Sequence, residues 1–181
     1  MTNTQWVVCP TGVPLIRRRC LRCRSARYQT HGKFRVNANH KLLDVWLLAL
    51  CAGCGETIKL TVLERVNVRA IDSSMLDRFH DNDITLAATL LGDPGLLRRN
   101  GVALDWDGAW DLRSTDMPDT GVIDISVRFI QPIPVRLTRL LAAGLGISRS
   151  QVLRLVTDGN LSSARRLTGT SSSDFSFTLR R

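Results

Sequence analysis

Residues 51–60 have the sequence CAGCGETIKL, in which two cysteines three positions apart precede a strand-like alternation of polar and apolar residues. An earlier pair, CLRC, contains Cys20 and Cys23, so the full pattern is C-x2-C, 27 intervening residues and C-x2-C. Two residues between cysteines allow both thiolates to reach one ion from a tight turn, and zinc binds four such ligands in a tetrahedron. The spacing therefore predicts one structural zinc ion held by Cys20, Cys23, Cys51 and Cys54.

Other uses of paired cysteines fit the pattern less well. A redox pair is expected where a strand leads into a helix, which neither pair does, and disulfides are disfavoured in a cytoplasmic chain. Four cysteine ligands leave no open position for water, so a catalytic zinc is not expected, whereas iron is an alternative to zinc. Gly55 follows the second pair, where glycine takes positive φ at little cost, and Arg24 follows the first. Cys9 is interpreted as a buried thiol, and His31 and His40 as surface residues.

The composition of the 181 residues is that of a soluble globular protein, with 44% hydrophobic and 23% charged residues. No apolar run approaches the roughly 18 residues of a membrane span. The first ten residues, MTNTQWVVCP, have neither a basic region nor a continuous apolar stretch, so no signal peptide is expected. These features predict a cytoplasmic protein without membrane association.

The net charge of +9 is unevenly distributed. Residues 1–70 contain 12 Lys/Arg and 3 Asp/Glu, residues 71–130 contain 5 and 11, and residues 131–181 contain 8 and 2. Two basic ends around an acidic middle suggest separate modules and an anionic partner. A basic patch is expected around the first cysteine pair, formed by Arg17, Arg18, Arg19, Arg22, Arg24 and Arg27.

Hydrophobic periodicity predicts an α+β protein in three parts. Strands are expected at LIRRRC, GKFRVN, LLDVWLLAL, ETIKLTVLERV and GVIDISVRFI. Helical spacing in MLDRF and ITLAATLLG is expected to stop at residues 92–95, and VALDWDGAWDL is expected to form a hairpin around Asp107 and Gly108. The predicted domains are a β-rich zinc ribbon at 1–70, an acidic α/β connector at 71–131 and a C-terminal module at 132–181, with QPIP as the last boundary.

The C-terminal module contains the sequence IPVRLTRLLAAGLGISRSQVLRLVTDGNL. Its first helix is expected to bury leucines and to expose Arg139. Ser148 and Gln151 have the spacing of a capping box at the start of the second helix, and Gly159 is placed to end it. The expected apolar face of the second helix consists of Val152, Leu153, Leu155 and Val156.

This pattern resembles the alpha-L motif, the RNA-binding fold of small-subunit ribosomal protein S-four. The resemblance covers about fifty residues and implies a helix-turn-helix followed by a β-hairpin, which lays a basic surface on structured RNA. The chain departs from the motif at Thr138, where the family usually has Asp, and in GNLSSARRLTG, which lacks the family's Val-Asn-Gly turn. The implied RNA-facing residues are Arg136, Arg139, Arg149, Ser150, Gln151, Arg154, Arg165 and Arg166. The whole chain also resembles a bacterial family of unknown function that combines a four-cysteine ribbon with this motif.

The acidic middle contains no recognisable catalytic set. Asp105, Asp107 and Asp111 lack the spacing of a calcium loop and are interpreted as part of a turn, and His80 as a surface residue. The sequence therefore predicts a non-enzymatic, zinc-stabilised protein that binds structured RNA such as ribosomal RNA, with no small-molecule substrate. The alternatives are a protein interaction adaptor and a DNA-binding transcriptional regulator with a helix-turn-helix.

Overall fold

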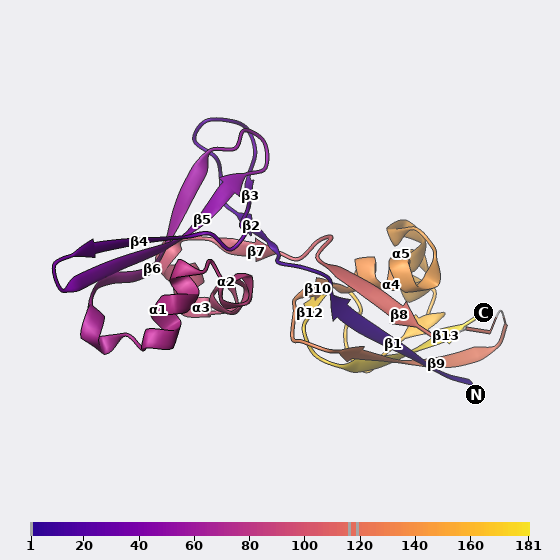
Figure 1. The fold of residues 1–181 in the computed structure, drawn as a ribbon. Helices are drawn as coiled ribbons and strands as arrows, with labels where there is room; N and C mark the ends of the chain where they lie inside the picture. Colours follow the sequence, from indigo (N-terminus) through magenta and orange to yellow (C-terminus); the bar gives the residue numbers. More distant parts are fainter. Residues whose placement is uncertain (1, 116, 119) are drawn as a thin grey trace. The chain divides into compact units, whose positions relative to one another are not determined.

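The computed structural model describes residues 2–115, 117–118 and 120–181 and contains two compact units, each described by itself (Figure 1). Unit 1 consists of Met1–Gly12 and Trp106–Arg181, and unit 2 of Val13–Asp105. Both units combine helices with sheets, so the expected mixture of α and β structure is confirmed. Among the described residues, no helix has the length and apolar character needed to cross a membrane.

Unit 2 is built on an antiparallel sheet in which the long strand β5 pairs with β3 and β4 on one side and with β6 on the other. β2 joins β3, and β7 joins β2 at the end of the sheet. The strands are β2 (Leu15–Arg17), β3 (Arg27–Gln29), β4 (Phe34–Asn39), β5 (Leu42–Cys51), β6 (Thr57–Asn67) and β7 (Ala103–Asp105). A 3-10 turn, η1 (Val68–Ala70), leads into helices α1 (Ser73–His80), α2 (Ile84–Leu91) and α3 (Pro94–Asn100).

The three helices cover one face of the unit 2 sheet. Every second residue of β5 is buried, and Val45 and Leu47 belong to one core cluster with Phe79, Leu86 and Leu96 from the helices. The period of two in a strand places these β5 side chains on a single face. The core of unit 2 therefore depends on helices that were predicted to belong to a separate connector.

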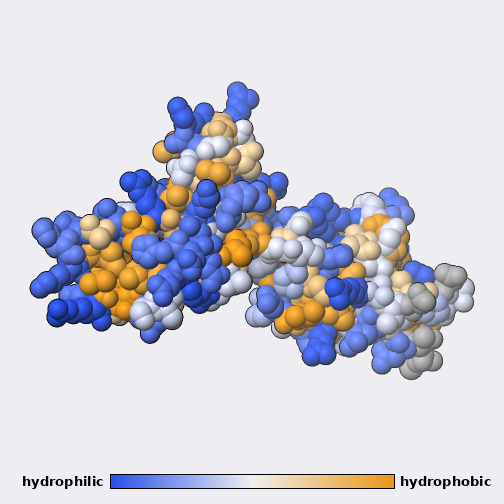
Figure 2. Space-filling view, viewed as in Figure 1, coloured by the Kyte–Doolittle hydropathy of each residue, from blue (hydrophilic) through white to orange (hydrophobic). Residues whose placement is uncertain are grey.

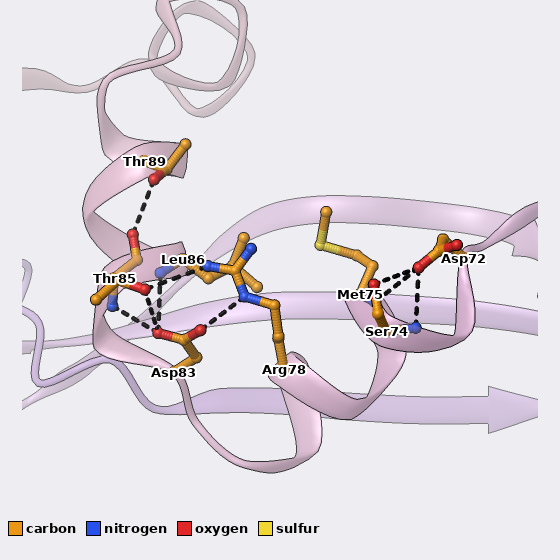
Figure 3. A network of polar contacts seen from close by, with 8 residues as sticks. All are labelled: Asp72, Ser74, Met75, Arg78, Asp83, Thr85, Leu86 and Thr89. Carbon is orange, nitrogen blue, oxygen red and sulfur yellow. Dashed lines mark hydrogen bonds and ion pairs between the residues drawn. The ribbon is translucent and has the colours of Figure 1, made fainter.

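The aspartates of the acidic segment cap these helices. The side chains of Asp72, Asp83 and Asp93 accept hydrogen bonds from the backbone N–H groups that begin α1, α2 and α3. Figure 3 shows the first two caps, with Asp83 also receiving the Arg78 guanidinium at 2.6 Å. The negative charge of this segment is thus used locally to satisfy and complement helix N-termini.

Helix α2 stops at residues 92–95, as the sequence had predicted, but a further helix that was not predicted begins within the same residues. Gly92 ends α2, but Pro94 occupies the first turn of α3, where a missing N–H costs nothing. α3 then ends at Gly101, which has φ of 61°.

Unit 1 contains a five-stranded sheet in the order β11-β13-β9-β1-β8, in which β1 and β9 are parallel and the other pairs antiparallel. The strands of unit 1 are β1 (Thr2–Pro10), β8 (Trp110–Ser114), β9 (Val122–Phe129), β10 (Val135–Arg136), β11 (Leu161–Ser162), β12 (Thr170–Ser171) and β13 (Phe175–Arg180). Helices α4 (Leu137–Leu145) and α5 (Arg149–Thr157) share a core with the sheet through Trp6, Ile125, Leu140, Val152 and Phe177.

The predicted hairpin around Asp107 and Gly108 is wrong. Gly108 has φ of 88°, and Ala109 N–H donates to the Trp106 carbonyl, so the chain does turn here. However, β7 before the turn pairs with β2, whereas β8 after it pairs with β1. The turn therefore passes the chain from unit 2 back to unit 1.

The two units also differ from the three predicted domains. β1 belongs to unit 1 because it pairs with β8 and β9, so residues 1–70 do not form one domain. The predicted connector at 71–131 is divided at Trp106, and its strand β9 lies at the centre of the sheet beside α4 and α5. Long-range strand pairing, which local patterns do not encode, sets these boundaries.

Candidate metal centre and basic surfaces

The four predicted cysteines come together at one end of unit 2. The Sγ atoms of Cys20, Cys23, Cys51 and Cys54 all lie within 4.8 Å of one another. Cys20 Sγ is 3.7 Å from Cys54 Sγ, and Cys23 Sγ is 3.6 Å from Cys51 Sγ. The loops that carry them connect β2 to β3 and β5 to β6, at the top of unit 2 in Figure 1.

The two cysteine loops have the same hydrogen-bond pattern. Cys20 N–H donates to the Ser25 carbonyl, and Cys51 N–H donates to the Glu56 carbonyl, which closes each loop five residues on. Backbone N–H groups also donate to sulfur in both loops, from Arg22 to Cys20 and from Gly53 to Cys51, each at 3.4 Å. Such N–H groups stabilise negative charge on sulfur, so both loops are arranged to present thiolates.

The sulfur positions fit a tetrahedral metal ion. Four sulfurs about 2.3 Å from a central ion lie about 3.8 Å from one another, close to the two distances given above. A disulfide requires about 2.05 Å, and all five cysteines are free. Neither pair leads into a helix, since a strand follows each loop, so the redox alternative lacks its expected setting. The four cysteines could therefore hold one metal ion.

The site favours the charged form of at least one thiol. The Tyr28 hydroxyl bonds to Cys20, and with the Arg22 backbone N–H it lowers the pKa of Cys20 to about 6. Tyr28 is almost completely buried. Glu56 and then the thiolates raise the pKa of Arg22, whose guanidinium lies 2.8 Å from the Glu56 carboxylate. Metal ligation requires thiolates, and the pKa of Cys51 is also lowered, whereas burial and the neighbouring thiols raise the pKa of Cys23 and of Cys54.

Two glycines shape the second loop. Gly55 has φ of 74°, as its position after the pair had predicted. At Gly53, a Cβ would lie 3.0 Å from Ser25 Cβ and 3.1 Å from Cys23 Sγ, because the first loop packs directly against it. This role of Gly53 could not be predicted from the sequence, since it depends on contact with a loop almost thirty residues away.

The six predicted arginines of the first loop and its flanks are all exposed, but they are not equivalent. Arg22 pairs with Glu56, and Arg27 lies 3.4 Å from Asp105. Within the part of the chain that the structure describes, no ion pair involves the other four, which are Arg17, Arg18, Arg19 and Arg24. Figure 2 shows hydrophilic surface beside hydrophobic surface at this end of unit 2.

The chain belongs to the DUF1062 family. This family, described as a protein of unknown function, matches residues 36–167, which is more than half of the chain. The match begins in β4, after the first cysteine pair, and continues through both units to a point beyond α5. Comparison with curated proteins and with solved structures found no match.

In this DUF1062 protein, the C-terminal helices form as the sequence had predicted. Ser148 and Gln151 make the capping box of α5, and Gly159, with φ of 74°, follows its end. α4 buries Leu137, Leu140 and Leu141. Leu153, which was predicted to be buried, is 45% exposed, because the short α5 presents only its Val152 side fully to the core.

The predicted RNA-facing residues differ in their exposure and in whether their side chains contact other residues of the protein. Arg136, Arg149 and Arg154 are exposed. Arg139 lies 3.0 Å from the Asp107 carboxylate, and Gln151 Oε1 accepts a hydrogen bond from Ser148 N–H.

Local contacts also involve the remaining three predicted residues. Ser150 Oγ lies 2.9 Å from Ser148 Oγ, and the Arg165 guanidinium lies over the Phe175 ring. Arg166 is exposed and donates to the Thr168 hydroxyl. Within the described residues, Arg136, Arg149 and Arg154 are therefore the exposed arginines of this set without an ion pair, side-chain hydrogen bond or ring contact.

The other cysteine and histidine predictions are confirmed. Cys9 is buried in β1 of unit 1 and is not part of the four-cysteine cluster. His31, His40 and His80 are exposed. Asp111 Oδ1 accepts a hydrogen bond from Leu112 N–H, as expected for a residue that supports local structure.

Proposed function

We propose that this DUF1062 protein is a non-enzymatic, zinc-stabilised RNA-binding protein whose C-terminal helices contact structured RNA. The observation that carries the proposal is that Arg149 and Arg154 are both exposed, at the start and in the middle of one capped helix, α5. Among the described residues, no carboxylate forms an ion pair with either guanidinium. Two uncompensated arginines on a rigid helix are available for phosphates.

The order of elements supports an RNA surface of the alpha-L kind. α4 ends at Gly146, which has φ of 66°, and α5 follows at once before β11 and β13. Proteins with the alpha-L motif use two such helices and the following turn to hold a basic surface against structured RNA. Arg136, at the N-cap of α4, is a further exposed arginine of this module.

We propose zinc as the ion of the four-cysteine centre. A closed set of four thiolates on two loops is the arrangement of structural zinc sites, and it leaves no coordination position for a substrate. The ion would tie the β2–β3 loop to the β5–β6 loop. It would thereby hold the exposed Arg17, Arg18, Arg19 and Arg24 in place as a second basic surface.

The test is co-purification of the intact protein with RNA at low salt, followed by sequencing of the bound RNA. The test variant is Arg149→Glu with Arg154→Glu. The control variant is Arg69→Glu with Arg98→Glu, which makes the same change in net charge at exposed positions of unit 2. We expect one class of structured RNA to be enriched with the parent and control proteins and lost with the test variant.

Salt dependence provides a second readout of the same interaction. Binding through phosphates should weaken steeply with salt because counterions are released. Binding that ignores salt, or that survives in the α5 variant, would contradict the proposal.

A protein interaction adaptor is the second candidate function. Leu153 is 45% exposed on α5, close to the two arginines, and an exposed leucine is more useful to a protein interface than to a phosphate contact. A partner that is retained after nuclease treatment and lost on Leu153→Ser would favour this function over RNA binding.

A further inference from the structure

The face of the unit 2 sheet opposite the helices carries an apolar stripe. Val45, Leu47 and Ala49 of β5 point toward α1, α2 and α3, so the residues between them point the other way. These residues are Trp46, Leu48 and Leu50, and Leu50 is 40% exposed. Half-buried and exposed apolar side chains in a row are unusual on a solvent-facing strand, where polar residues are expected.

Basic side chains lie on both sides of this stripe. In the strand register, Arg35 of β4 is opposite Trp46, and Lys59 of β6 is opposite Leu48. Lys59 Nζ lies 5.2 Å from the centroid of the Trp46 ring. The Trp46 ring therefore has one face turned toward a cation, and the stripe runs between positive charges.

A groove continues the stripe toward β3. Its volume is about 310 Å³, and its floor is formed by Leu48 and Leu50. The remaining lining residues are Gln29, His31, Lys33 and Thr57. Lys33 thus places another positive charge beside the apolar floor. The protein has only three lysines, and two of them, Lys33 and Lys59, border this stripe.

The only acidic residue of β5 lies beyond Trp46 on the same face, away from the groove. This residue is Asp44, and its carboxylate accepts a hydrogen bond from Arg65 N–H at 2.8 Å. The charged residues that line the groove or lie opposite Trp46 and Leu48 are Lys33, Arg35 and Lys59, so an occupant should combine apolar groups with negative charges.

We propose that this face binds single-stranded nucleic acid, with bases on Trp46, Leu48 and Leu50 and phosphates on Lys33, Arg35 and Lys59. Single strands present flat apolar bases and regularly spaced phosphates, and proteins bind them with aromatic platforms in positively charged grooves. Side chains on one face of a strand are about 6.7 Å apart, which gives successive unstacked bases successive supports. A base on the Trp46 ring replaces the Lys59 ammonium, which then meets the adjacent phosphate. This surface is separate from α5, and the proposal does not depend on structured RNA binding there.

The experiment measures binding of a labelled, unstructured 12-nucleotide oligouridine to the intact protein by fluorescence anisotropy. Trp46→Thr removes the platform but keeps a residue suited to a strand, and we expect it to weaken binding about tenfold. Trp46→Phe keeps an aromatic ring and should bind within about threefold of the parent protein.

Charge variants test the phosphate contacts separately from the platform. Lys59→Gln and Arg35→Gln should each reduce the slope of log affinity against log salt by about 0.7. The matched control is Arg98→Gln, which removes one exposed charge from α3 on the helical side of the same sheet and should leave the slope unchanged. Metal content and circular dichroism check that each variant is folded.

The outcomes distinguish this surface from α5. Weaker oligouridine binding by the Trp46→Thr protein and a smaller salt slope for the Lys59→Gln protein, with parent-like binding by the Arg149→Glu and Arg154→Glu protein, support the proposal. Loss only in the α5 variant overturns it, as does the absence of oligouridine binding. Preference of the sheet face for polyglutamate over oligouridine also overturns it, because the occupant would then be an acidic peptide.

Discussion

At the scale of single residues, Gly144 explains how unit 1 accommodates its largest buried side chain. The Trp6 indole is fully buried and lies against α4 at this glycine. A Cβ at residue 144 would lie 2.3 to 2.6 Å from three carbons of the indole ring. Trp6 also packs edge-on against Phe177, with ring centroids 5.2 Å apart, so the indole has little room to move. The cost of a glycine within a helix is thus offset by close packing.

Gly144→Ala should therefore destabilise unit 1 by about 1–3 kcal/mol through overpacking, even though alanine is the better helix former. Gly12→Ala is the control, since a Cβ there meets nothing within 4 Å. Denaturant unfolding followed by tryptophan fluorescence measures both. A Gly144→Ala protein as stable as the Gly12→Ala protein would show that the indole can shift.

Residues whose chemistry requires a fixed spacing could be predicted from the sequence, whereas residues whose role depends on distant neighbours could not. The four cysteines were predictable because thiolates that share an ion recur at short, fixed intervals. Gly144 lies inside α4, which continues to Leu145, and its contact with Trp6 joins residues far apart in sequence. Gly53 was missed for the same physical reason.

At the scale of elements, α2 depends on a cap whose charge can be separated from its hydrogen bonds. Asp83 accepts from Thr85 N–H at 2.7 Å and from the Thr85 hydroxyl at 2.6 Å (Figure 3). The Thr85 hydroxyl and then Arg78 lower the pKa of Asp83. Because the folded state lowers this pKa, the ionised cap adds stability above the unfolded pKa of about 3.9, and that contribution is lost as the pH falls through the folded value.

Asp83→Asn should therefore keep the cap but lose its pH dependence. We expect its melting temperature to lie a few degrees below that of the parent protein at pH 7, with the difference shrinking as the pH falls below about 4. Asp83→Ala should be the least stable at every pH from 3 to 7, because it lacks the cap itself. Thermal melts across that range measure all three proteins, and a constant difference between parent and Asp83→Asn would contradict the role of the charge.

Strands with alternating buried and exposed residues could be predicted from the sequence. Helix starts that depend on the position of one residue were predicted only in part. The period of two in β5, β6 and β9 predicted those strands, and the capping box predicted the start of α5. Pro94 was interpreted as a stop, although proline is also suited to a first helical turn, and Asp93 before it is the cap that decides between the two. The partners of β7 and β8 could not be predicted, because both flank the same turn and pair with strands far away in sequence.

At the scale of the whole molecule, unit 2 is an insertion between two neighbouring strands of unit 1. β1 ends at Pro10, which is paired with Trp110 at the start of β8, and Thr11 N–H donates to the Ala109 carbonyl at 3.0 Å. Paired residues of antiparallel strands are about 5 Å apart, so a hairpin-sized link could replace residues 13–105. The division into two units also changes how charge is distributed compared with the three predicted segments. Unit 2 contains 15 Lys/Arg and 9 Asp/Glu, and unit 1 contains 10 Lys/Arg and 7 Asp/Glu. Both units are basic, and neither is an acidic connector.

Each unit should therefore fold without the other, because each has its own buried cluster. Replacing residues 13–105 with a short Gly-Ser link should give a protein that melts cooperatively and contains no metal. Residues 13–105 alone should retain about one equivalent of zinc, which Cys51→Ser removes. Cys20 and Cys51 belong to the same buried cluster as the helices, but most of that cluster is apolar, so metal removal should lower the melting temperature of this fragment without abolishing its helical signal.

Circular dichroism and elemental analysis of the two proteins decide the outcome. Zinc in the 13–105 fragment together with a cooperative melt of the linked unit 1 confirms two independent folding units, and iron in the fragment would replace zinc as the structural ion. A linked unit 1 that fails to melt cooperatively would show that β1, β8 and β9 need the inserted chain to pair. In that case the pairing of β1 with β8 would depend on the folding of unit 2, and unit 2 could not be removed from between them.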